Sequence, residues 1–398
     1  MKRGENESIE QLRPLYDKIQ FLRKISRNYV FLIGYACNLA CSYCFQRAEG
    51  SILDIKSHLD AILSPSLAAK AFNVIENHSS QSKTPPTVEI SGGEPLLPHY
   101  HPSLNYILSK CQERGYPTFL TTNGTHLVDS IKLLQGRISV ANITLDGPQI
   151  IHNRRRPFKS GEGSFLRISK GIKAAQDALI PIQVKVTVDT QNVDHLPEFG
   201  MWVEEQGWFD NPNIKFGLTL VVPYSGTPSA NSYAKYQGQM VEKIVEILKN
   251  HSVLNRFDFV PQGGGWFVNS LLGGESLPVF RTCDMDGTFV FDALGNIYSC
   301  IRAAGNSDWQ IGTYYPHFRI TSKFWNCLKT RSVYTLEKCQ KCAFALICGG
   351  GCPYDAYLAS GAIDTPYCRA YTQVIDTWLP YFYQKYVRNE LSSRDGEE

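Results

Sequence analysis

Six short apolar segments that alternate with helical stretches constrain the fold of this chain more than any other feature. The strand-like segments are residues 29–35, 87–91, 117–121, 138–145, 181–188 and 214–222. Helical patterns lie between them at residues 66–78, 102–114, 164–178 and 194–206. Strands that alternate with helices form a parallel sheet through right-handed crossovers. We therefore expect an α/β fold, either a partial barrel or an open doubly wound sheet, with its chemistry at the carboxyl ends of the strands.

The composition is that of an ordinary globular protein. The chain has 398 residues, 43% of them hydrophobic and 19% charged, which excludes wholesale disorder and suggests two or three domains. Its 40 Lys and Arg against 37 Asp and Glu leave a net charge of +3, which makes no electrostatic case for nucleic acid or a membrane surface as partner. No apolar run approaches the ~18–20 residues of a membrane span, and no apolar signal core begins the chain. We expect a cytoplasmic protein.

The chain divides into five parts. Residues 1–28 predict an amphipathic helix that closes one end of the core, with Ser8 and Gln11 resembling a capping box. Residues 29–235 hold the strand–helix units and 236–282 a bridging region. Residues 283–370 are rich in cysteine and glycine, so we expect metal to replace hydrophobic core there. Residues 371–398 predict a final helix, bent at Pro380, and a tail.

Twelve cysteines are unusual in a chain without a secretion signal, and they favour metal binding or catalysis over disulfides. Cys37, Cys41 and Cys44 directly follow the first strand. Three thiolates on one loop can hold one soft metal centre, and on a four-iron cluster they leave one iron open to a cofactor or substrate. A zinc site would need a fourth ligand, and the nearest histidine is His58.

This C-x3-C-x2-C spacing after a first strand resembles the radical S-adenosylmethionine (radical SAM) superfamily. Further motifs of that family follow the second, third and fourth strands in order: Ser91, Gly92, Gly93 and Glu94, then Asn123 and Gly124, then Asp146 and, soon after, Arg156. The resemblance implies a partial (β/α)6 TIM-like barrel. It also implies a glycine turn and Glu94 at the cofactor's amino group, where glycine permits close approach and a carboxylate suits an ammonium. Arg156, with Arg154 and Arg155 as rivals, would contact the cofactor's carboxylate, and Tyr43 would pack on its adenine.

A second series of seven cysteines resembles the SPASM domain, an auxiliary iron–sulfur domain of radical SAM maturases. Its members are Cys283, Cys300, Cys339, Cys342, Cys348, Cys352 and Cys368. The resemblance implies that Cys339, Cys342, Cys348 and Cys368 ligate a distal 4Fe-4S cluster and that Cys283, Cys300 and Cys352 ligate a nearer one. The nearer cluster's fourth position would be open or filled by Asp284, Asp286, Cys327 or substrate. A zinc ribbon is the alternative for the C-x2-C pairs. Cys111 and Cys327, left over, are interpreted as small buried hydrophobes.

The resemblance implies three 4Fe-4S clusters and reductive cleavage of S-adenosylmethionine at the cluster of Cys37, Cys41 and Cys44. The product is a 5′-deoxyadenosyl radical that abstracts hydrogen from a substrate, while the protein orients the reactants and excludes side reactions. An electron donor such as a flavodoxin or ferredoxin is required. The auxiliary clusters would accept the leftover electron or bind the substrate.

Three reactions fit this resemblance. The favoured one is a peptide maturase that crosslinks side chains of a ribosomally made precursor peptide, through a carbon–carbon (cyclophane), carbon–oxygen or thioether bond. Sulfatase maturation to formylglycine is the second, but those enzymes place an aspartate base directly after the cysteine matching Cys300, where this chain has Ile301 and Arg302. Oxidation of a small molecule is the third, and such enzymes tend to have a shortened auxiliary domain.

Two further expectations concern partners and class. Only 28 residues precede the first strand, so leader recognition would fall to the N-terminal helix, the barrel rim, the bridging region or a separate leader-binding protein. An iron–sulfur electron-transfer protein is the alternative of another class. The intact Gly92-Gly93-Glu94 turn and Arg156 argue against it, because a relay needs no cofactor pocket.

Overall fold

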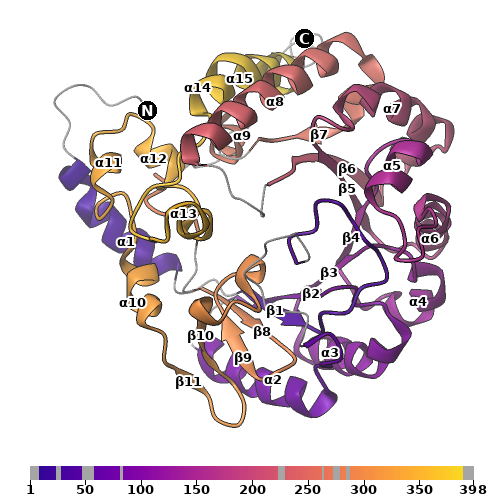
Figure 1. Ribbon diagram of the computed structural model, residues 1–398, viewed down its shortest axis with the longest axis horizontal. Helices are drawn as coiled ribbons and strands as arrows, with labels where there is room; N and C mark the ends of the chain where they lie inside the picture. The colour runs from indigo at the N-terminus through magenta and orange to yellow at the C-terminus, as the bar shows by residue number, and fades with distance from the viewer. Residues whose placement is uncertain are drawn as a thin grey trace, which may run out of the picture.

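A computed structural model describes residues 9–23, 28–46, 58–80, 84–222, 229–261, 264–271, 278–283 and 287–388. Its strands form one sheet in the order β11-β10-β9-β8-β1-β2-β3-β4-β5-β6-β7 (Figure 1). The strands are β1 (Asn28–Leu32), β2 (Thr87–Ser91), β3 (Thr118–Thr122), β4 (Val140–Thr144), β5 (Ile182–Val188), β6 (Ile214–Leu220), β7 (Asp258–Phe259), β8 (Thr288–Phe291), β9 (Asn296–Tyr298), β10 (Gln310–Thr313) and β11 (Arg319–Ile320).

The sheet is mostly parallel, which confirms the α/β class. Strands β1 to β7 pair in chain order, and β8 pairs in parallel with the other side of β1. Because the order does not reverse at β1, the open doubly wound alternative is wrong. The six strands expected between residues 29 and 222 are present, and β7 and β8 are two parallel strands that the sequence did not reveal. β7 has only two residues, too few to show a period. Antiparallel β9, β10 and β11 extend the same sheet, and the domain limits at 236 and 283 stay predictions.

Helices follow the parallel strands and cover the outer side of the curved sheet (Figure 1). Local residues set their ends: Ser64 Oγ accepts a hydrogen bond from Leu67 N at 3.2 Å before α2, and Gly115 ends α3 in the left-handed conformation. The helices are α1 (Arg13–Arg23), α2 (Pro65–Ser79), α3 (His101–Arg114), α4 (Leu127–Leu134), α5 (Gln149–Arg155), α6 (Phe165–Asp177), α7 (Leu196–Glu205), α8 (Ala230–Asn250), α9 (Gly265–Leu271), α10 (Lys323–Thr330), α11 (Glu337–Gln340), α12 (Ala345–Cys348), α13 (Pro353–Ser360), α14 (Tyr371–Gln373) and α15 (Leu379–Phe382).

The two faces of the sheet differ in burial. Along β5 and β6 every second residue, such as Val184, Val186 and Phe216, is buried in the main hydrophobic core that includes the helices. The residues between them are exposed, as Lys185 and Lys215 are, or partly exposed, and they point to the opposite face. At β5 and β6 the sheet therefore buries one face against helices and has a polar inner face, whereas Val30 and Leu32 of β1 belong to a second buried apolar cluster.

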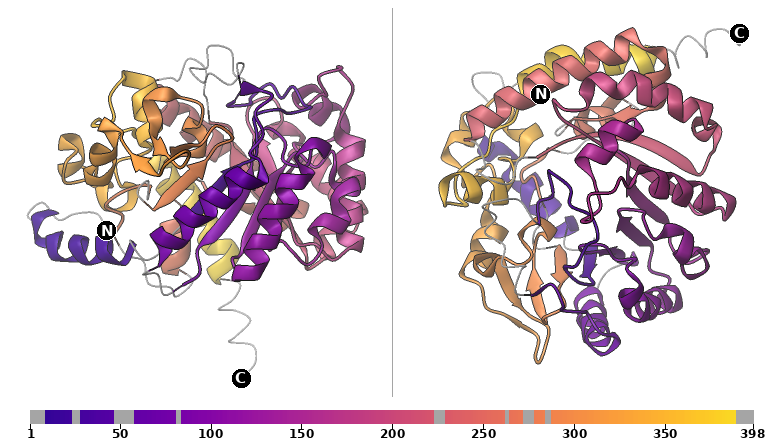
Figure 2. Two further views of the ribbon diagram at one scale, coloured as in Figure 1. Left: turned by 90° about the horizontal axis from the view of Figure 1, so that it is seen from below. Right: turned by 45° about the vertical axis from the view of Figure 1, so that its right-hand side comes forward.

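The N-terminal helix lies elsewhere than the sequence suggested. The first described residues form a short 3-10 turn and α1, and Tyr16 of α1 packs against Phe280 and Tyr334, with ring centroids 5.3 and 5.0 Å apart. These residues belong to a separate apolar cluster of the cysteine-rich region, so α1 covers that region instead of an end of the main core (Figure 2). Ser8 of the expected capping box lies outside the described residues.

The C-terminal segment is helical from Tyr371 to Arg388, as expected, but its turns are widened. π-helical turns at Val374–Trp378 and Tyr383–Arg388 flank α15, and Pro380 is the second residue of α15, in its first turn. A π turn changes the hydrogen-bond ladder, which accommodates proline without an N–H. Trp378 Nε1 donates to Phe259 O at 2.8 Å and fastens this segment to β7.

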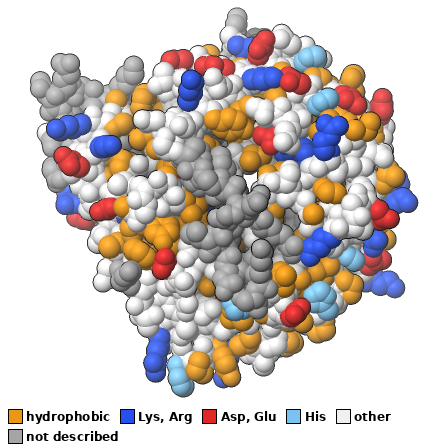
Figure 3. All heavy atoms as spheres, viewed as in Figure 1, with side chains coloured by type: hydrophobic (Ala, Val, Ile, Leu, Met, Phe, Trp, Pro, Cys, Tyr) orange, Lys and Arg blue, Asp and Glu red, His pale blue; other side chains and the backbone are white. Residues whose placement is uncertain are grey.

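The described residues contain no candidate membrane span, and the face drawn in Figure 3 has no large area of a single charge. No helix among the described residues is long and apolar enough to cross a membrane. On the face shown in Figure 3, basic and acidic side chains are interspersed around the periphery.

Candidate active site

The loop with Cys37, Cys41 and Cys44 follows β1 and is tied to two later segments. Ala40 N donates to Pro157 O at 2.8 Å, which joins the loop to the chain after α5. On its other side, Asn123 Nδ2 donates to Asn38 Oδ1 at 2.8 Å and lies 3.7 Å from Cys37 Sγ. All three cysteines are partly exposed. The structure therefore brings the cysteine loop together with Asn123 and the Arg156 segment at the carboxyl ends of the strands.

The glycine turn after β2 packs directly against this loop. Gly93 N donates to Gly34 O and Glu94 N to Ala36 O, both at 2.9 Å. A Cβ on Gly93 would lie only 2.1 Å from Ala36 O. Glycine is required at residue 93 because two backbone segments touch there. Ser91 is the last residue of β2 and is buried.

The Glu94 carboxylate already has partners within the protein. It is fully buried; Oε1 accepts from Thr122 Oγ1 at 2.5 Å and from Leu96 N at 2.9 Å, while Oε2 accepts from Asn123 N at 2.6 Å. Burial raises the pKa of Glu94, and these hydrogen bonds oppose the rise. The carboxylate therefore joins the turn after β2 to the turn after β3, and its Oε2 keeps capacity for one more donor.

Of the three consecutive arginines, Arg156 alone is buried without a carboxylate in ion-pair contact among the described residues. Its Nη1 donates to Tyr43 Oη at 2.7 Å, and its buried Nε has no hydrogen-bond partner. Arg154 is exposed. Arg155 is 1% exposed and its Nη1 donates to Asp189 Oδ1 at 2.6 Å. Arg156 is therefore the one of the three that combines burial with the lack of a carboxylate in ion-pair contact among the described residues.

The Asp146 carboxylate contacts several other residues of the site. It is fully buried; its Oδ2 accepts from Tyr43 Oη and lies 3.5 Å from Arg155 Nε, and its Oδ1 accepts from Thr187 N at 2.9 Å. The Arg155 guanidinium also lies over the Tyr43 ring, 4.8 Å from its centroid. Asp146 and Tyr43 are therefore partners of each other in this network.

Sequence reasoning missed Asp189 and Asn192, which complete the network together with His152. Asn192 Nδ2 donates to Asp146 O at 2.8 Å, and His152 Nδ1 accepts from Asp146 N at 3.1 Å. Asp189 directly follows β5, and its position after a strand end was the available indication.

The seven later cysteines fall into two groups. Burial, then Cys348, Cys342 and Cys368, raise the pKa of Cys339 to about 12, because these thiols lie near one another. Burial and Asp355, with smaller contributions from nearby Cys283 and Cys300, raise the pKa of Cys352 to about 12. In the part of the chain that the structure describes, no three Cys, His, Asp or Glu side chains converge closely enough to chelate a single metal ion.

The two remaining cysteines differ from each other. Cys111 is fully buried in α3, as expected. Cys327 is exposed, so its interpretation as a buried hydrophobe is wrong. Leu328, the next residue, is on the buried side of α10. Because neighbouring residues of a helix point about 100° apart, Cys327 points away from that side. Asp284 and Asp286 lie outside the described residues.

Arg302 follows Ile301 and is the second residue after Cys300. It forms an ion pair with a buried carboxylate. Its Nη2 donates to Asp355 Oδ1 at 2.6 Å, and its Nη1 lies 3.7 Å from Cys352 Sγ. The second residue after Cys300 is therefore a cation that is paired with Asp355.

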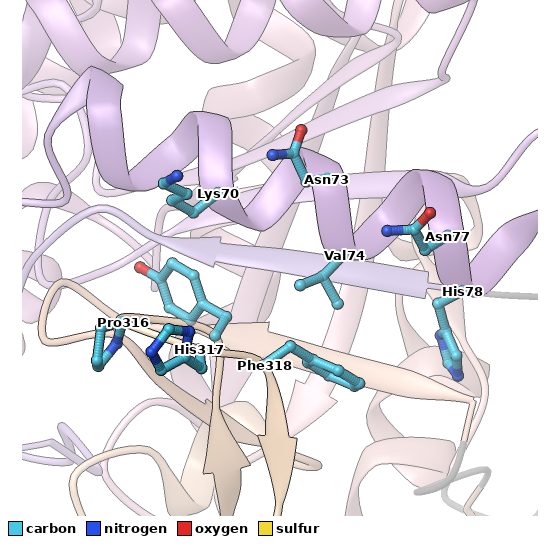
Figure 4. Close-up of a pocket in the computed structure, with 9 residues that line it drawn as sticks. Lys70, Asn73, Val74, Asn77, His78, Pro316, His317 and Phe318 are labelled. Atoms are coloured by element: carbon cyan, nitrogen blue, oxygen red, sulfur yellow. The ribbon is translucent and has the colours of Figure 1, made fainter.

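A groove of about 400 Å³ lies apart from the cysteines. α2 and the turn between β10 and β11 form its walls (Figure 4). Its lining residues are Lys70, Asn73, Val74, Asn77, His78, Tyr314, Pro316, His317 and Phe318. None of the residues discussed above lines it.

Comparison with known protein families and sequences supports this geometry. Residues 31–202 match the Radical SAM superfamily. A cysteine-type anaerobic sulfatase-maturating enzyme of Clostridium perfringens (strain 13 / Type A) is 24% identical over 372 residues, covering 86% of this chain and 94% of that enzyme. A serine-type anaerobic sulfatase-maturating enzyme of Bacteroides thetaiotaomicron is 24% identical over 394 residues, covering 92% and 91%.

Solved structures share the fold. "Native anSMEcpe with bound AdoMet and Kp18Cys peptide" superposes with a TM-score of 0.68 at 18% identity, covering 90% of this chain and 98% of that one. SuiB of Streptococcus suis bound to S-adenosylmethionine has a TM-score of 0.60 at 14% identity, covering 91% and 82%.

Proposed function

With a radical SAM domain at residues 31–202, this chain is an enzyme of the radical SAM superfamily, and we propose that it is a maturase that oxidatively crosslinks side chains of a precursor peptide. Cys37, Cys41 and Cys44 would hold a 4Fe-4S cluster with one open iron. S-adenosylmethionine, when bound there and reduced, supplies a 5′-deoxyadenosyl radical that abstracts a hydrogen atom from the substrate.

Arg156 is the observation that carries the cofactor assignment. A buried guanidinium without a carboxylate partner is costly, and its unsatisfied Nε calls for an acceptor. The carboxylate of S-adenosylmethionine is an anion of the right kind. The closely packed Gly92-Gly93 turn beside the cysteine loop would receive the cofactor's amino group, with Glu94 Oε2 as a nearby acceptor.

The remaining residues of the site act by orientation. Asp146, Arg155 and Asp189 hold the Tyr43 ring and the backbone of the cysteine loop, because Arg155 O also accepts from Ser42 N at 3.0 Å. Asn123 holds Asn38 in the same loop. These hydrogen bonds keep the three thiols in one arrangement when the cofactor binds.

We extend the proposal to two auxiliary 4Fe-4S clusters in a SPASM domain. The two groups of cysteines described above support it: four around Cys339 and three around Cys352. Cys327 is not among the residues that act on the pKa of Cys352, which counts against it as the fourth ligand of the nearer cluster; an open position, the substrate, Asp284 or Asp286 would then complete that cluster.

Arg302 supports crosslinking over formylglycine formation. A carboxylate base for a simple dehydrogenation is absent at Ile301, and Arg302 is committed to Asp355 and Cys352. The two sulfatase-maturating relatives, which match nearly the whole chain, favour formylglycine formation as the second candidate. Both candidates oxidise a side chain of a peptide.

The polar inner face of the sheet is where we propose that the precursor peptide lies. Exposed Lys185 and Lys215 project from this face on neighbouring strands, at diagonal positions of the register. A flavodoxin or ferredoxin as electron donor, a separate leader-binding protein and a cytoplasmic location complete the proposal.

Anaerobic reconstitution tests it. The protein with S-adenosylmethionine and a reductant should bind about 12 iron atoms per chain and release 5′-deoxyadenosine. Replacing Cys37, Cys41 and Cys44 with Ala should remove one third of the iron and all of the 5′-deoxyadenosine. A protein that binds 12 iron atoms and makes no 5′-deoxyadenosine, with or without candidate peptides, would be an electron-transfer protein.

The product separates the two peptide reactions. A crosslink removes one hydrogen from each of two residues and creates no aldehyde, whereas the aldehyde of formylglycine reacts with a hydrazide. Hydrazide labelling of a sulfatase-derived peptide, with no crosslink in any precursor peptide, would replace the first candidate by the second.

A further inference from the structure

Arg331 is a buried arginine whose every nitrogen donates to a backbone carbonyl. The side chain precedes α11 and is 7% exposed. Nε donates to Ile363 O at 2.6 Å and Nη1 to Gly351 O at 2.9 Å, while Nη2 donates to Gly350 O at 3.0 Å and Thr365 O at 2.8 Å. One side chain therefore joins the segment at residues 350–351 to the segment at residues 363–365.

The carbonyl partners lie between the two cysteine groups. Gly350 and Gly351 belong to the link between Cys348, of the group around Cys339, and Cys352, of the other group. All three glycines of this link, Gly349 to Gly351, have φ between 66° and 84°, a left-handed run that other residues rarely adopt. The link turns so that consecutive carbonyls face Arg331.

The charge of Arg331 lies close to both groups. A Cβ placed on Gly350 would be 3.5 Å from Arg331 Nη1 and 3.7 Å from Cys339 Sγ. Burial lowers the pKa of Arg331, and Cys352, Cys339, Cys283 and Cys348 act against that decrease. These four thiols come from both groups.

Carbonyls alone do not balance this charge. No Asp or Glu among the described residues forms an ion pair with Arg331. An unpaired buried charge costs several kcal/mol unless an opposite charge lies near. Among the residues that the structure describes, the negative charge near Arg331 comes from the thiolate sulfur of the cysteines, once they ligate metal.

We propose that Arg331 is the shared counter-ion of the two auxiliary clusters and a positioning residue that raises the reduction potentials of both. The inference rests on the proposed auxiliary clusters and adds the residue that couples them. A cluster held by thiolates is anionic, and reduction adds a negative charge. A buried cation beside it favours the reduced state, and more strongly than in water because the local dielectric is low.

The experiment measures reduction potentials in the full chain. In a background with Cys37, Cys41 and Cys44 replaced by Ala, only the auxiliary clusters contribute to the spectra. Arg331→Met removes the charge, Arg331→Lys keeps the charge without the planar fork, and Arg319→Met removes an exposed arginine of β11 as a matched control. Each variant is titrated anaerobically with EPR detection, and its iron is counted.

The iron content of the triple-alanine background distinguishes a failure of this inference from a failure of the proposed function. It should bind about 8 iron atoms per chain. A background with no auxiliary iron contradicts the proposed clusters, whereas 8 iron atoms with potentials indifferent to Arg331→Met contradicts only the role of Arg331.

The expected result is a shift of both potentials to more negative values in Arg331→Met. At a fixed potential the ratio of reduced to oxidised cluster should fall at least tenfold, which is 59 mV for one electron. Arg331→Lys and Arg319→Met should keep the ratio within threefold of the background. Should Arg331→Met fail to bind iron, recovery of iron and potentials by Arg331→Lys supports the charge, and loss of iron in both variants overturns it.

Discussion

Arg302 Nη2 lies 2.6 Å from Asp355 Oδ1, and only 1% of the Asp355 side chain is exposed. The pair joins the turn after Cys300 to α13, which begins next to Cys352. The second arginine near this carboxylate is Arg369, whose Nη2 lies 3.8 Å from Asp355 Oδ2. Asp355 therefore neutralises buried positive charge beside the nearer cysteine group.

Asp355→Asn should destabilise the folded protein by about 3 kcal/mol, because it leaves buried arginines without their anion. The double variant Arg302→Met with Asp355→Leu should lose less than Asp355→Asn alone, because it removes both charges. Anaerobic thermal unfolding of the two variants and the parent measures this. A double variant less stable than Asp355→Asn would show that Arg302 is not the main ion-pair partner of Asp355.

Arg156→Met should raise the S-adenosylmethionine concentration for half-maximal 5′-deoxyadenosine release by about 10–100-fold, the loss expected for one charged hydrogen-bond partner. Arg154→Met, at the exposed neighbouring position, serves as the control and should stay within about twofold. Steady-state release measured by chromatography compares the two. Equal effects of both substitutions would rule out Arg156 as the carboxylate ligand.

Gly93→Ala should disrupt the first site alone, because its Cβ would meet Ala36 O at 2.1 Å and push the cysteine loop away. We expect loss of about 4 of about 12 iron atoms and no 5′-deoxyadenosine. The control is Gly265→Ala in α9, where a Cβ meets nothing within 4 Å; alanine also suits a helix. Iron analysis with full 12-iron content in Gly93→Ala would contradict the close packing of the turn.

His152 makes stability depend on pH. Burial, then Arg156 and Arg155, lower the pKa of His152 well below 6.5. Its Nδ1 accepts from Asp146 N, so its Nε2 carries the proton and donates to Ser164 Oγ at 3.0 Å, which in turn donates to Arg156 O at 2.5 Å. The folded ring is neutral, whereas the unfolded chain takes up a proton at about pH 6.5.

The free energy of unfolding should therefore fall as pH falls below about 6.5, by up to about 1.4 kcal/mol per pH unit from this residue. Above that pH the contribution is fully present. His152→Gln should remove this part of the slope, while the control His195→Gln, at a partly exposed position, should keep it. Unfolding measured between about pH 5.5 and 7.5 tests the difference, and an unchanged slope in His152→Gln would refute the neutral ring.

Much of the fold could be predicted because it is local. A period of two residues marks a strand and a period near four marks a helix, and both can be seen in consecutive side chains. The sequence therefore predicted β1 to β6 and helices α2, α3, α6 and α7 within a few residues of their observed ends, whereas the shorter α4 and α5 were not predicted. β7 and β8 escaped because two and four residues show no period, and their place in the sheet depends on pairing with strands distant in the chain.

The sequence by itself determined after which strand each motif lies and how the cysteines are spaced, because both are properties of neighbouring residues. Only the tertiary structure distinguishes the three arginines: Arg155 is paired with Asp146 and Asp189, Arg154 is exposed, and Arg156 is buried with no carboxylate in ion-pair contact among the described residues. It also placed α1 on the cysteine-rich region, exposed Cys327, and enclosed Arg331 between two cysteine groups. These outcomes depend on which distant charges and carbonyls meet in a buried space, and the energy of a buried charge is set by those neighbours.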